Sequence, residues 1–249
     1  GALRKIGGRA RVALEPQRVY VRKAQYSFSW DWGPKLTTSG IWRTISVQAF
    51  SSARLKNPFA KVISVTKQEA VVELSVEVER FSVRSLDESS MTRPVGSRRP
   101  SDKKDLLQLR AFVGGEGASV EQTVKVNGNS AKLSLRIPHP KLWWPNGYGE
   151  QPMYKAVLSL LKDGEEVDEI EVPFAIRTVR LLQEKDKQGK SFVIEVNSVK
   201  MICKGADWIP SDSFIPRIPD SKYETLLTLA KSAHMNMIRV WGGCIYEQY

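Results

Sequence analysis

The chain has 249 residues, of which 41% are hydrophobic and 26% are charged, a composition typical of a folded globular protein. This length predicts two or three structural units rather than a single ordinary domain. No run of about 18 apolar residues occurs, so no membrane-spanning helix and no membrane partner are expected.

Positive charge is concentrated near the start of the chain. The formal net charge is +11, and residues 1–51 carry nine Lys or Arg against two acidic residues, a net +7. A basic arm that binds nucleic acid is one interpretation. The charges, however, are spaced through strand-like sequence and no recognition motif accompanies them. We therefore favour a solvated basic face and expect no nucleic-acid partner.

Cysteine and histidine are sparse. Cys203 and Cys244 cannot form a disulfide framework, and together with His139 and His234 they match no zinc-ligand spacing. The sequence therefore predicts no metal site and no cofactor.

Residues 26–34, with the sequence YSFSWDWGP, alternate aromatic and polar side chains. This period of two predicts a strand with an aromatic face, and places Asp31 on the polar face just before a turn. The aromatic face comprises Tyr26, Phe28, Trp30 and Trp32. A carboxylate beside tryptophans suits a sugar, because the acid accepts hydroxyl hydrogen bonds and flat rings stack on the C–H face of a pyranose. Spacing alone favours a core strand whose Asp caps a turn.

Two further strands, at residues 18–24 and 41–50, flank this segment. Three strands are too few for a closed β domain, so residues 1–51 are predicted to be the C-terminal part of a larger sandwich.

A second unit, residues 52–178, contains seven short alternating segments separated by turn residues such as Asn127-Gly128 and Asp163-Gly164. This pattern predicts an immunoglobulin-like β-sandwich. The strands are expected at residues 61–66, 70–81, 106–113, 120–126, 132–137, 153–161 and 167–172. Residues 84–105 are rich in Ser, Pro and charge and are predicted to be a mobile loop, with a regulatory or partner-binding role as the alternative.

Residues 179–249 change pattern. A hairpin is predicted at residues 192–206, and Ser221-x-x-Glu224 predicts a capping box at the start of a helix that a strand at residues 235–241 follows. Strand, helix and strand form a βαβ unit with parallel strands, as at the start of an α/β barrel. The predicted fold is therefore mostly β with an α/β end.

Active sites of such barrels lie at the C-terminal ends of the strands. Arg239 and Trp241 occupy that position on one strand, and Asp207 and Trp208 on the other. A buried Arg needs an anionic partner, and the sequence leaves a structural and a catalytic carboxylate equally open.

Several motifs together resemble the β-mannosidases of the family-two glycoside hydrolases, in order and approximate spacing. They are SFSWDWGP (27–34) with GIWR (40–43), LWWPNG (142–147), KGADWIP (204–210) with DSF (212–214), and NMIRVWGG (236–243) with IYEQ (245–248). The resemblance covers nearly the whole chain.

The resemblance implies an exo-acting retaining hydrolase of terminal β-D-mannose in oligosaccharides or glycoconjugates, with a β-mannoside oligosaccharide as partner. It also implies three regions: the C-terminal part of a jelly-roll sugar-binding domain (1–51), an immunoglobulin-like sandwich (52–178) and the start of a (β/α)8 catalytic barrel (179–249). A sibling β-galactosidase, β-glucuronidase or exo-glucosaminidase, or a non-catalytic carbohydrate-binding module, remains open.

Retaining glycosidases use two carboxylates, and in this family both are glutamates on later barrel strands, the acid/base one following Asn. No Asn-Glu pair occurs in the sequence, so no catalytic residue is assigned and the chain alone is expected to be inactive.

The resemblance implies that this chain supplies substrate-binding residues. These are Trp30, Asp31, Trp32, Arg239 and Trp241. Asp31 would bind a ring hydroxyl, Arg239 would orient a catalytic glutamate, and Trp241 would form one side of the mannose subsite. One of the two tryptophans in 30–32 is expected to pack inward because of the strand pleat.

Asp207 and Trp208 are predicted to support the site from behind. Asp207 stands where the family usually has Asn, which changes the hydrogen bonds available there. Trp143 and Trp144 are expected to pack in a core rather than contact sugar.

No pattern in the sequence indicates an oligomeric state. The absence of an Asn-x-Ser/Thr site mildly disfavours a glycosylated lysosomal protein. A periplasmic or secreted location is slightly favoured, and a lysosomal one stays open.

Overall fold

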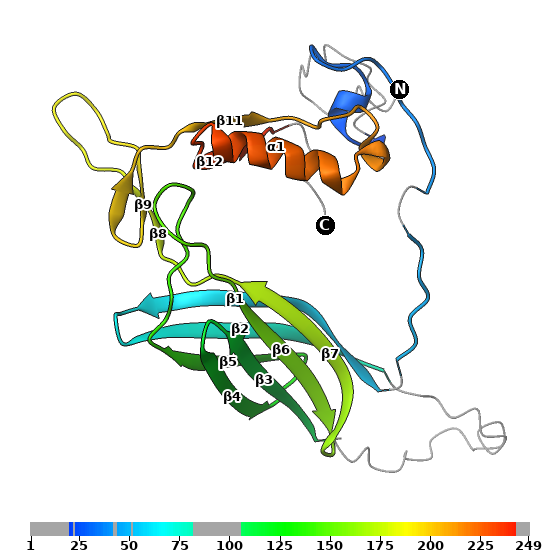
Figure 1. Cartoon of the computed structure of the whole chain (residues 1–249). Coiled ribbons are helices and arrows are strands. Elements are labelled where there is room, and N and C mark those ends of the chain that lie inside the picture. Colours follow the sequence, from blue (N-terminus) through cyan, green and yellow to red (C-terminus); the bar gives the residue numbers. More distant parts are fainter. Residues whose placement is uncertain (1–19, 22, 42–43, 51, 82–105, 243–249) are drawn as a thin grey trace. The chain divides into compact units, whose positions relative to one another are not determined.

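The computed structural model describes residues 20–21, 23–41, 44–50, 52–81 and 106–242 (Figure 1). They fall into two compact units, one drawn from Gly1–Ser46 and Cys203–Tyr249, the other from Val47–Ile202. The loop predicted at residues 84–105 lies outside the described residues. No helix in the described part is long and apolar enough to cross a membrane.

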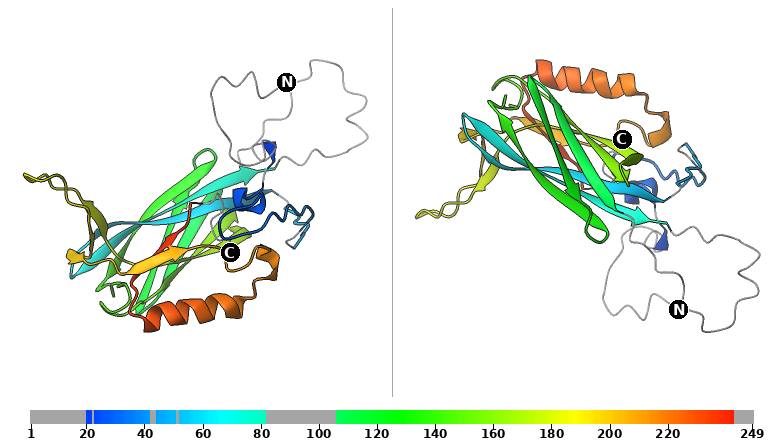
Figure 2. Two further views of the ribbon diagram at one scale, coloured as in Figure 1. Left: turned by 90° about the horizontal axis from the view of Figure 1, so that it is seen from above. Right: turned by 90° about the horizontal axis from the view of Figure 1, so that it is seen from below.

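The Val47–Ile202 unit contains a seven-stranded β-sandwich, which confirms the predicted immunoglobulin-like pattern (Figure 1). One sheet has the order β1-β2-β5 and the other β4-β3-β6-β7, with antiparallel neighbours. Figure 2 shows the cyan strands β1 and β2 lying across the green strands of the other sheet. The strands are β1 (Ala53–Val65), β2 (Glu69–Arg80), β3 (Leu107–Gly115), β4 (Ala118–Lys125), β5 (Ser130–Pro138), β6 (Tyr154–Lys162) and β7 (Glu165–Phe174).

Alternation along the strands builds the core of the sandwich, because successive side chains point to opposite faces. In β2 the inward residues are buried, and the outward row consists mainly of glutamates paired with basic residues of β1 and β5. The inward residues of β2 are Ala70, Val72, Leu74, Val76 and Val78. Asp163 and Gly164 have φ of 52° and 92°, the positive values that a tight hairpin turn requires, as the Asp-Gly pair predicted.

Strand β1 starts earlier than the sequence predicted, at Ala53 rather than residue 61. Pro58 lies inside it, at a register shift between Lys56 and Phe59. A proline is tolerated there because β1 is an edge strand and the shift removes it from the ladder. The backbone N–H of Leu55 donates to Asp168 Oδ2 of β7 at 2.6 Å, which joins the two sheets.

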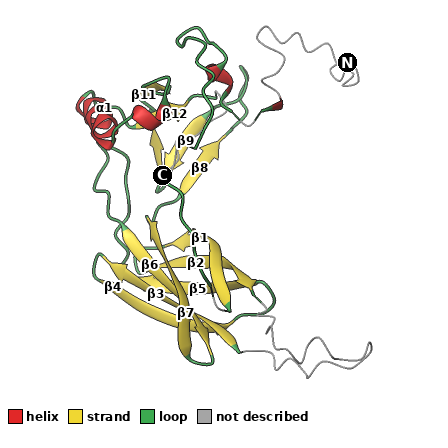
Figure 3. Ribbon diagram, turned by 90° about the vertical axis from the view of Figure 1, so that its right-hand side faces the viewer, coloured by secondary structure: helices red, strands yellow, loops and turns green. Residues whose placement is uncertain are grey.

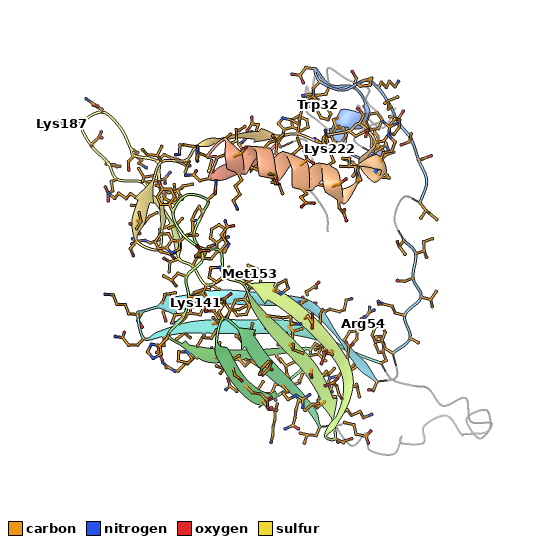
Figure 4. All side chains as sticks on the ribbon, in the orientation of Figure 1. Trp32, Arg54, Lys141, Met153, Lys187 and Lys222 are labelled. Atoms are coloured by element: carbon orange, nitrogen blue, oxygen red, sulfur yellow. The ribbon has the colours of Figure 1, made fainter. Side chains whose placement is uncertain are left out.

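A small antiparallel sheet, β8 (Val179–Leu182), β9 (Val193–Val196) and β10 (Val199–Met201), follows the sandwich. Lys187 lies in the long β8–β9 connection that projects in Figure 4. Asn197 joins this sheet to the sandwich: its Oδ1 accepts the Thr178 N–H and its Nδ2 donates to the Trp143 carbonyl, each at 3.0 Å. Trp143 and Trp144 are half-buried, and Trp143 lies under the Arg177 guanidinium at 4.3 Å. Trp143 thus packs against a neighbouring side chain, but neither tryptophan is among the buried residues of the core, where they were expected.

The other unit contains the βαβ element. Strands β11 (Gly205–Trp208) and β12 (Met237–Val240) pair in parallel and are connected through the 3-10 helix η5 (Ile215–Arg217) and helix α1 (Asp220–Ser232), which is labelled in Figure 3. This confirms the predicted order and parallel pairing.

Two details of that prediction are wrong. The second strand of the hairpin predicted at residues 192–206 is divided between β10 and β11, which lie in different sheets. Helix α1 begins at Asp220 with Pro219 as its N-cap residue and has no side-chain cap, so the Ser221–Glu224 capping box is not formed. Pro219 supplies the extended backbone before the helix, which therefore begins two residues earlier than the capping box predicted. Asp220 then places a carboxylate in the first turn of the helix.

The strand predicted at residues 26–32 is also wrong. Gln25–Ser27 form the 3-10 helix η3, and Phe28 makes one isolated bridge, to Lys35. In the described residues of 18–24 and 41–50 no strand forms either. A strand is stable only where neighbouring strands satisfy its N–H and C=O groups, and the described part of this segment offers none. The alternating pattern therefore does not produce strand geometry here.

Candidate functional site

A tight turn presents the Trp-Asp-Trp segment. The Trp30 N–H donates to the Gly33 carbonyl at 2.9 Å, and the Gly33 N–H donates back to Trp30 at 3.3 Å. Trp30 is 40% exposed and Asp31 is also exposed, whereas Trp32 is half-buried. Within the described ranges Asp31 makes no hydrogen bond. The turn thus exposes one flat ring and one carboxylate.

An aromatic cluster joins this turn to the end of β12, about two hundred residues later. Trp241 packs edge-on against Trp30 at 5.3 Å and Trp32 at 5.6 Å between ring centroids. Tyr26 contacts Trp32 at 5.1 Å and Trp241 at 6.4 Å. Edge-to-face pairs at these distances are favourable because ring edges carry positive charge and faces negative. The structure therefore brings together Trp30, Trp32 and Trp241, which the sequence proposed as parts of one site.

Trp32 is the tryptophan that packs inward, beside η3 (Figure 4). Its indole Nε1 is buried and has no hydrogen-bond partner among the described residues. A buried indole N–H usually finds an acceptor, and none of the described residues provides one for Trp32.

Asp207 and Arg239 form an ion pair across β11 and β12. They are direct neighbours in the parallel register, and Arg239 Nη1 donates to Asp207 Oδ1 at 2.9 Å. The Arg239 side chain is 61% exposed and the Asp207 side chain is 57% exposed, so the expectation of a buried Arg is wrong. Exposed pairs of this kind contribute about 1 kcal/mol or less to stability. The partner of Arg239 in the described part of the chain is therefore a neighbouring carboxylate held by strand pairing.

Gly205 determines how closely β11 approaches β12. A Cβ added at Gly205 would lie 1.8 Å from the Met237 carbonyl oxygen, which no side chain can occupy. At the other end the Trp241 N–H donates to the Trp208 carbonyl at 2.9 Å. These contacts hold the register that places Asp207 beside Arg239. Arg239 and Trp241 are two residues apart, so they share one face of the extended chain.

Trp208 does not belong to this face. Its ring stacks on Tyr223 of α1, with centroids 6.2 Å apart and planes inclined by 19°. It packs the helix against the strand, which is a structural role behind the strand rather than at the aromatic cluster.

The loop before α1 contains an interaction that the sequence reasoning missed. Asp212 accepts the Phe214 N–H at 2.7 Å and two hydrogen bonds from Arg217 Nη2, at 2.9 and 2.8 Å. The Phe214 N–H first, and Arg217 after it, hold the pKa of the Asp212 carboxyl below its usual range. An Asp two residues before its backbone donor is the pattern of an Asx turn, which could have predicted it. The loop also touches the turn, since a Cβ on Gly33 would lie 3.8 Å from Ser213 Oγ.

Titratable groups that could hold a metal do not gather in the described part of the chain: no group of three or more His, Cys, Asp or Glu side chains is close enough. The cluster and the neighbouring residues offer aromatic faces, carboxylates and one guanidinium, groups that bind polar molecules through stacking and hydrogen bonds.

Two family models match the chain. Residues 4–43 match the galactose-binding domain-like model of glycosyl hydrolase family 2, and residues 53–177, half of the chain, match the model of glycosyl hydrolases family 2.

Named relatives support the same family as these two models. The chain is 38% identical over 236 residues to beta-mannosidase B of Aspergillus fumigatus, covering 94% of this chain and 26% of that protein. It is 40% identical over 234 residues to beta-mannosidase B of Neosartorya fischeri, with 94% and 25% covered. The crystal structure of beta-D-mannosidase from Dictyoglomus thermophilum superimposes with a TM-score of 0.75 at 38% identity, covering 93% of this chain and 26% of that one.

The chain thus spans about a quarter of the length of the relatives it matches. Both the family models and the sandwich topology lead to the same assignment. The chain belongs to family 2 of the glycosyl hydrolases.

Proposed function

We propose that this chain is the substrate-binding part of an exo-acting retaining β-mannosidase, which removes terminal β-D-mannose from oligosaccharides or glycoconjugates. The observation that carries the proposal is the cluster in which Trp30 and Trp32 meet Trp241, with the exposed Asp31 carboxylate between the two tryptophans of the turn. The named relatives, both β-mannosidases, support mannose as the sugar.

Each residue of the cluster has a distinct role in this proposal. The exposed ring of Trp30 stacks on the C–H face of the terminal sugar, and Asp31 accepts hydrogen bonds from its hydroxyls. Trp241 forms the wall behind Trp30. Trp32 supports the ring of Trp241 from the inside.

The domain organisation is proposed on the same basis. Residues 1–51 form the end of a jelly-roll domain, 52–178 the immunoglobulin-like domain, and 179–249 the beginning of a catalytic barrel. Helix α1 contains no buried residue, and β11 and β12 form a two-stranded parallel sheet in the described part. Parallel sheets are normally covered on both faces, so this element needs further βα units. The two catalytic glutamates are supplied by such units, and this chain holds neither.

The binding proposal is tested by titrating the chain with methyl β-D-mannopyranoside while tryptophan fluorescence is recorded. Asp31→Ala is expected to weaken binding about tenfold or more, because hydrogen bonds to a charged group contribute roughly 1.5–3 kcal/mol. The control is Asp186→Ala, which removes an exposed turn carboxylate in the other unit. Equal affinity of the Asp31 variant and the wild type, or no mannoside binding at all, would refute the proposed site.

The proposed location of the catalytic glutamates is tested separately with an aryl β-mannoside. The chain alone is expected to give no turnover. Hydrolysis above the level of a mock preparation would show that this chain carries its own catalytic carboxylates.

A further inference from the structure

The loop that follows strand β11 lies against the turn that carries Trp30 and Asp31. Gly33, the residue that closes this turn, is buried, and a Cβ added to it would lie 3.8 Å from Ser213 Oγ, an ordinary van der Waals distance. Apart from the residues on either side of Gly33, Ser213 provides the only described atom within 4 Å of that position. Ser213 is therefore placed to support the backbone of the turn.

Two backbone hydrogen bonds close the turn, and one of them is long. The Trp30 N–H donates to the Gly33 carbonyl at 2.9 Å, and the Gly33 N–H donates to the Trp30 carbonyl at 3.3 Å. Trp241 packs against the ring of Trp30 and so fixes a side chain. The direction of Asp31 follows instead from the backbone of the turn, which Ser213 supports at Gly33.

Asp212 fixes the loop around Ser213. Its Oδ1 accepts the Phe214 N–H at 2.7 Å, and Nη2 of Arg217 donates to both carboxylate oxygens, at 2.9 and 2.8 Å. The Arg217 guanidinium also lies 4.6 Å from the centre of the Phe214 ring. A carboxylate that accepts the N–H two residues ahead fixes the backbone of the residue between them, which here is Ser213.

The place of this loop in the fold points to a role in binding. It leaves the C-terminal end of β11, where the Trp208 carbonyl accepts the Trp241 N–H at 2.9 Å. Loops at this end of barrel strands build the active site. The Asp212–Arg217 pair adds only modest stability, because the Arg217 side chain is 64% exposed.

We infer that Asp212 is a positioning residue for the sugar-binding turn. It fixes residues 211–217 so that Ser213 supports Gly33, and this support holds Trp30 and Asp31 in the orientation that receives the sugar. The inference rests on the proposed function, since it concerns the same turn. Asp212 acts through the loop and is not a catalytic residue.

The test uses the full chain and measures hydrogen exchange of the Trp30 and Gly33 amides by NMR. Asp212→Asn keeps an oxygen for the Phe214 N–H and loses the charge that binds Arg217. Exchange of both turn amides is expected to become about threefold to tenfold faster, the range for losing a partly exposed charge-assisted pair. The affinity for methyl β-D-mannopyranoside, from tryptophan fluorescence, should fall by a similar factor, because binding then has to order the turn.

Two further variants separate positioning from other effects. Arg217→Met removes the guanidinium and leaves the Asp212 bond to the Phe214 N–H, so it should change exchange and affinity in the same direction. Asp186→Asn is the matched control, because Asp186 is a turn carboxylate of the other unit that accepts two backbone N–H groups, at 2.7 and 2.8 Å. It changes net charge equally and should leave both measurements unchanged.

Unchanged exchange of the Trp30 and Gly33 amides in Asp212→Asn overturns the inference, because a carboxylate that fixes only its own loop would give that result. An equal rise in Asp186→Asn also overturns it, since net charge would then be the cause. Faster exchange with unchanged mannoside affinity overturns the role in sugar binding.

Failure of the proposed function is distinguishable from failure of this inference. If the wild type binds no mannoside, the β-mannosidase proposal is rejected, while faster exchange of the turn amides in Asp212→Asn still supports Asp212 as the residue that positions the turn. Mannoside binding with unchanged exchange in Asp212→Asn rejects the positioning role and leaves the proposed function intact.

Discussion

Trp241→Ala is expected to separate the Trp30–Gly33 turn from strand β12. The ring of Trp241 has three aromatic neighbours, with centroids 5.3 to 6.4 Å away. Removing a fully buried Trp or Phe costs about 3–5 kcal/mol, and aromatic pairs contribute about 0.5–1.5 kcal/mol each beyond burial. Because Trp241 is half-buried and its contacts are not additive, we expect a loss of about 2 to 3 kcal/mol in the stability of this unit.

The assay is urea unfolding followed by the indole N–H NMR signals of Trp30 and Trp32, which report on the cluster itself. With a urea slope of about 2 kcal/mol/M, the midpoint of these signals should fall by about 1 to 1.5 M. Trp143→Ala serves as control, since Trp143 packs under Arg177 in the other unit. The Trp143→Ala variant should leave the indole signals of Trp30 and Trp32 unchanged. If Trp241→Ala kept the wild-type midpoint, the cluster would not hold the turn, and the proposed site would lose its structural basis.

Two further predictions concern stability. Leu158→Ala should lower the free energy of unfolding of the sandwich by about 2–5 kcal/mol in a denaturant melt, because Leu158 is 0% exposed. The control is Leu181→Ala, which should cost less than about 1 kcal/mol because Leu181 is 49% exposed. Equal effects of the two substitutions would contradict the core assignment. Asp212→Asn should abolish a pH-dependent contribution to the free energy of unfolding. Because the pKa of Asp212 is depressed in the folded state, its ionised carboxyl stabilises the fold at pH values above the usual carboxyl range. This stabilisation is lost as the pH falls below about 4. Unfolding curves of variant and wild type should therefore converge on acidification, and a constant gap down to low pH would refute this.

The sandwich was predictable from the sequence because the alternation of apolar and polar residues along each strand is a local pattern. Alternation along β2 follows from the pleat, and each inward residue is buried by whichever strands pair with it. The βαβ order was equally readable, since helix period and strand period differ. The turn at Asp163-Gly164 depended on backbone conformations that these two residues adopt at low cost.

Residues 26–33 show where such reasoning fails. Their alternation is as regular as that of β2, yet they form a 3-10 helix and a turn. Period two states only which side chains would share a face if partner strands were present. Whether partners exist depends on distant parts of the chain, which the local pattern does not contain.

The sequence by itself determined which residue types could bind a sugar and, through its motifs, the family. Only the tertiary structure decided how they are used: Trp32 packs inward, Trp30 and Asp31 face solvent, and Trp241 joins them from the end of β12. It also decided that the anion beside Arg239 is Asp207, because parallel pairing and the missing side chain at Gly205 set the two strands in register. These are contacts between segments about two hundred or about thirty residues apart, and the spacing of residues along one segment carries no information about them.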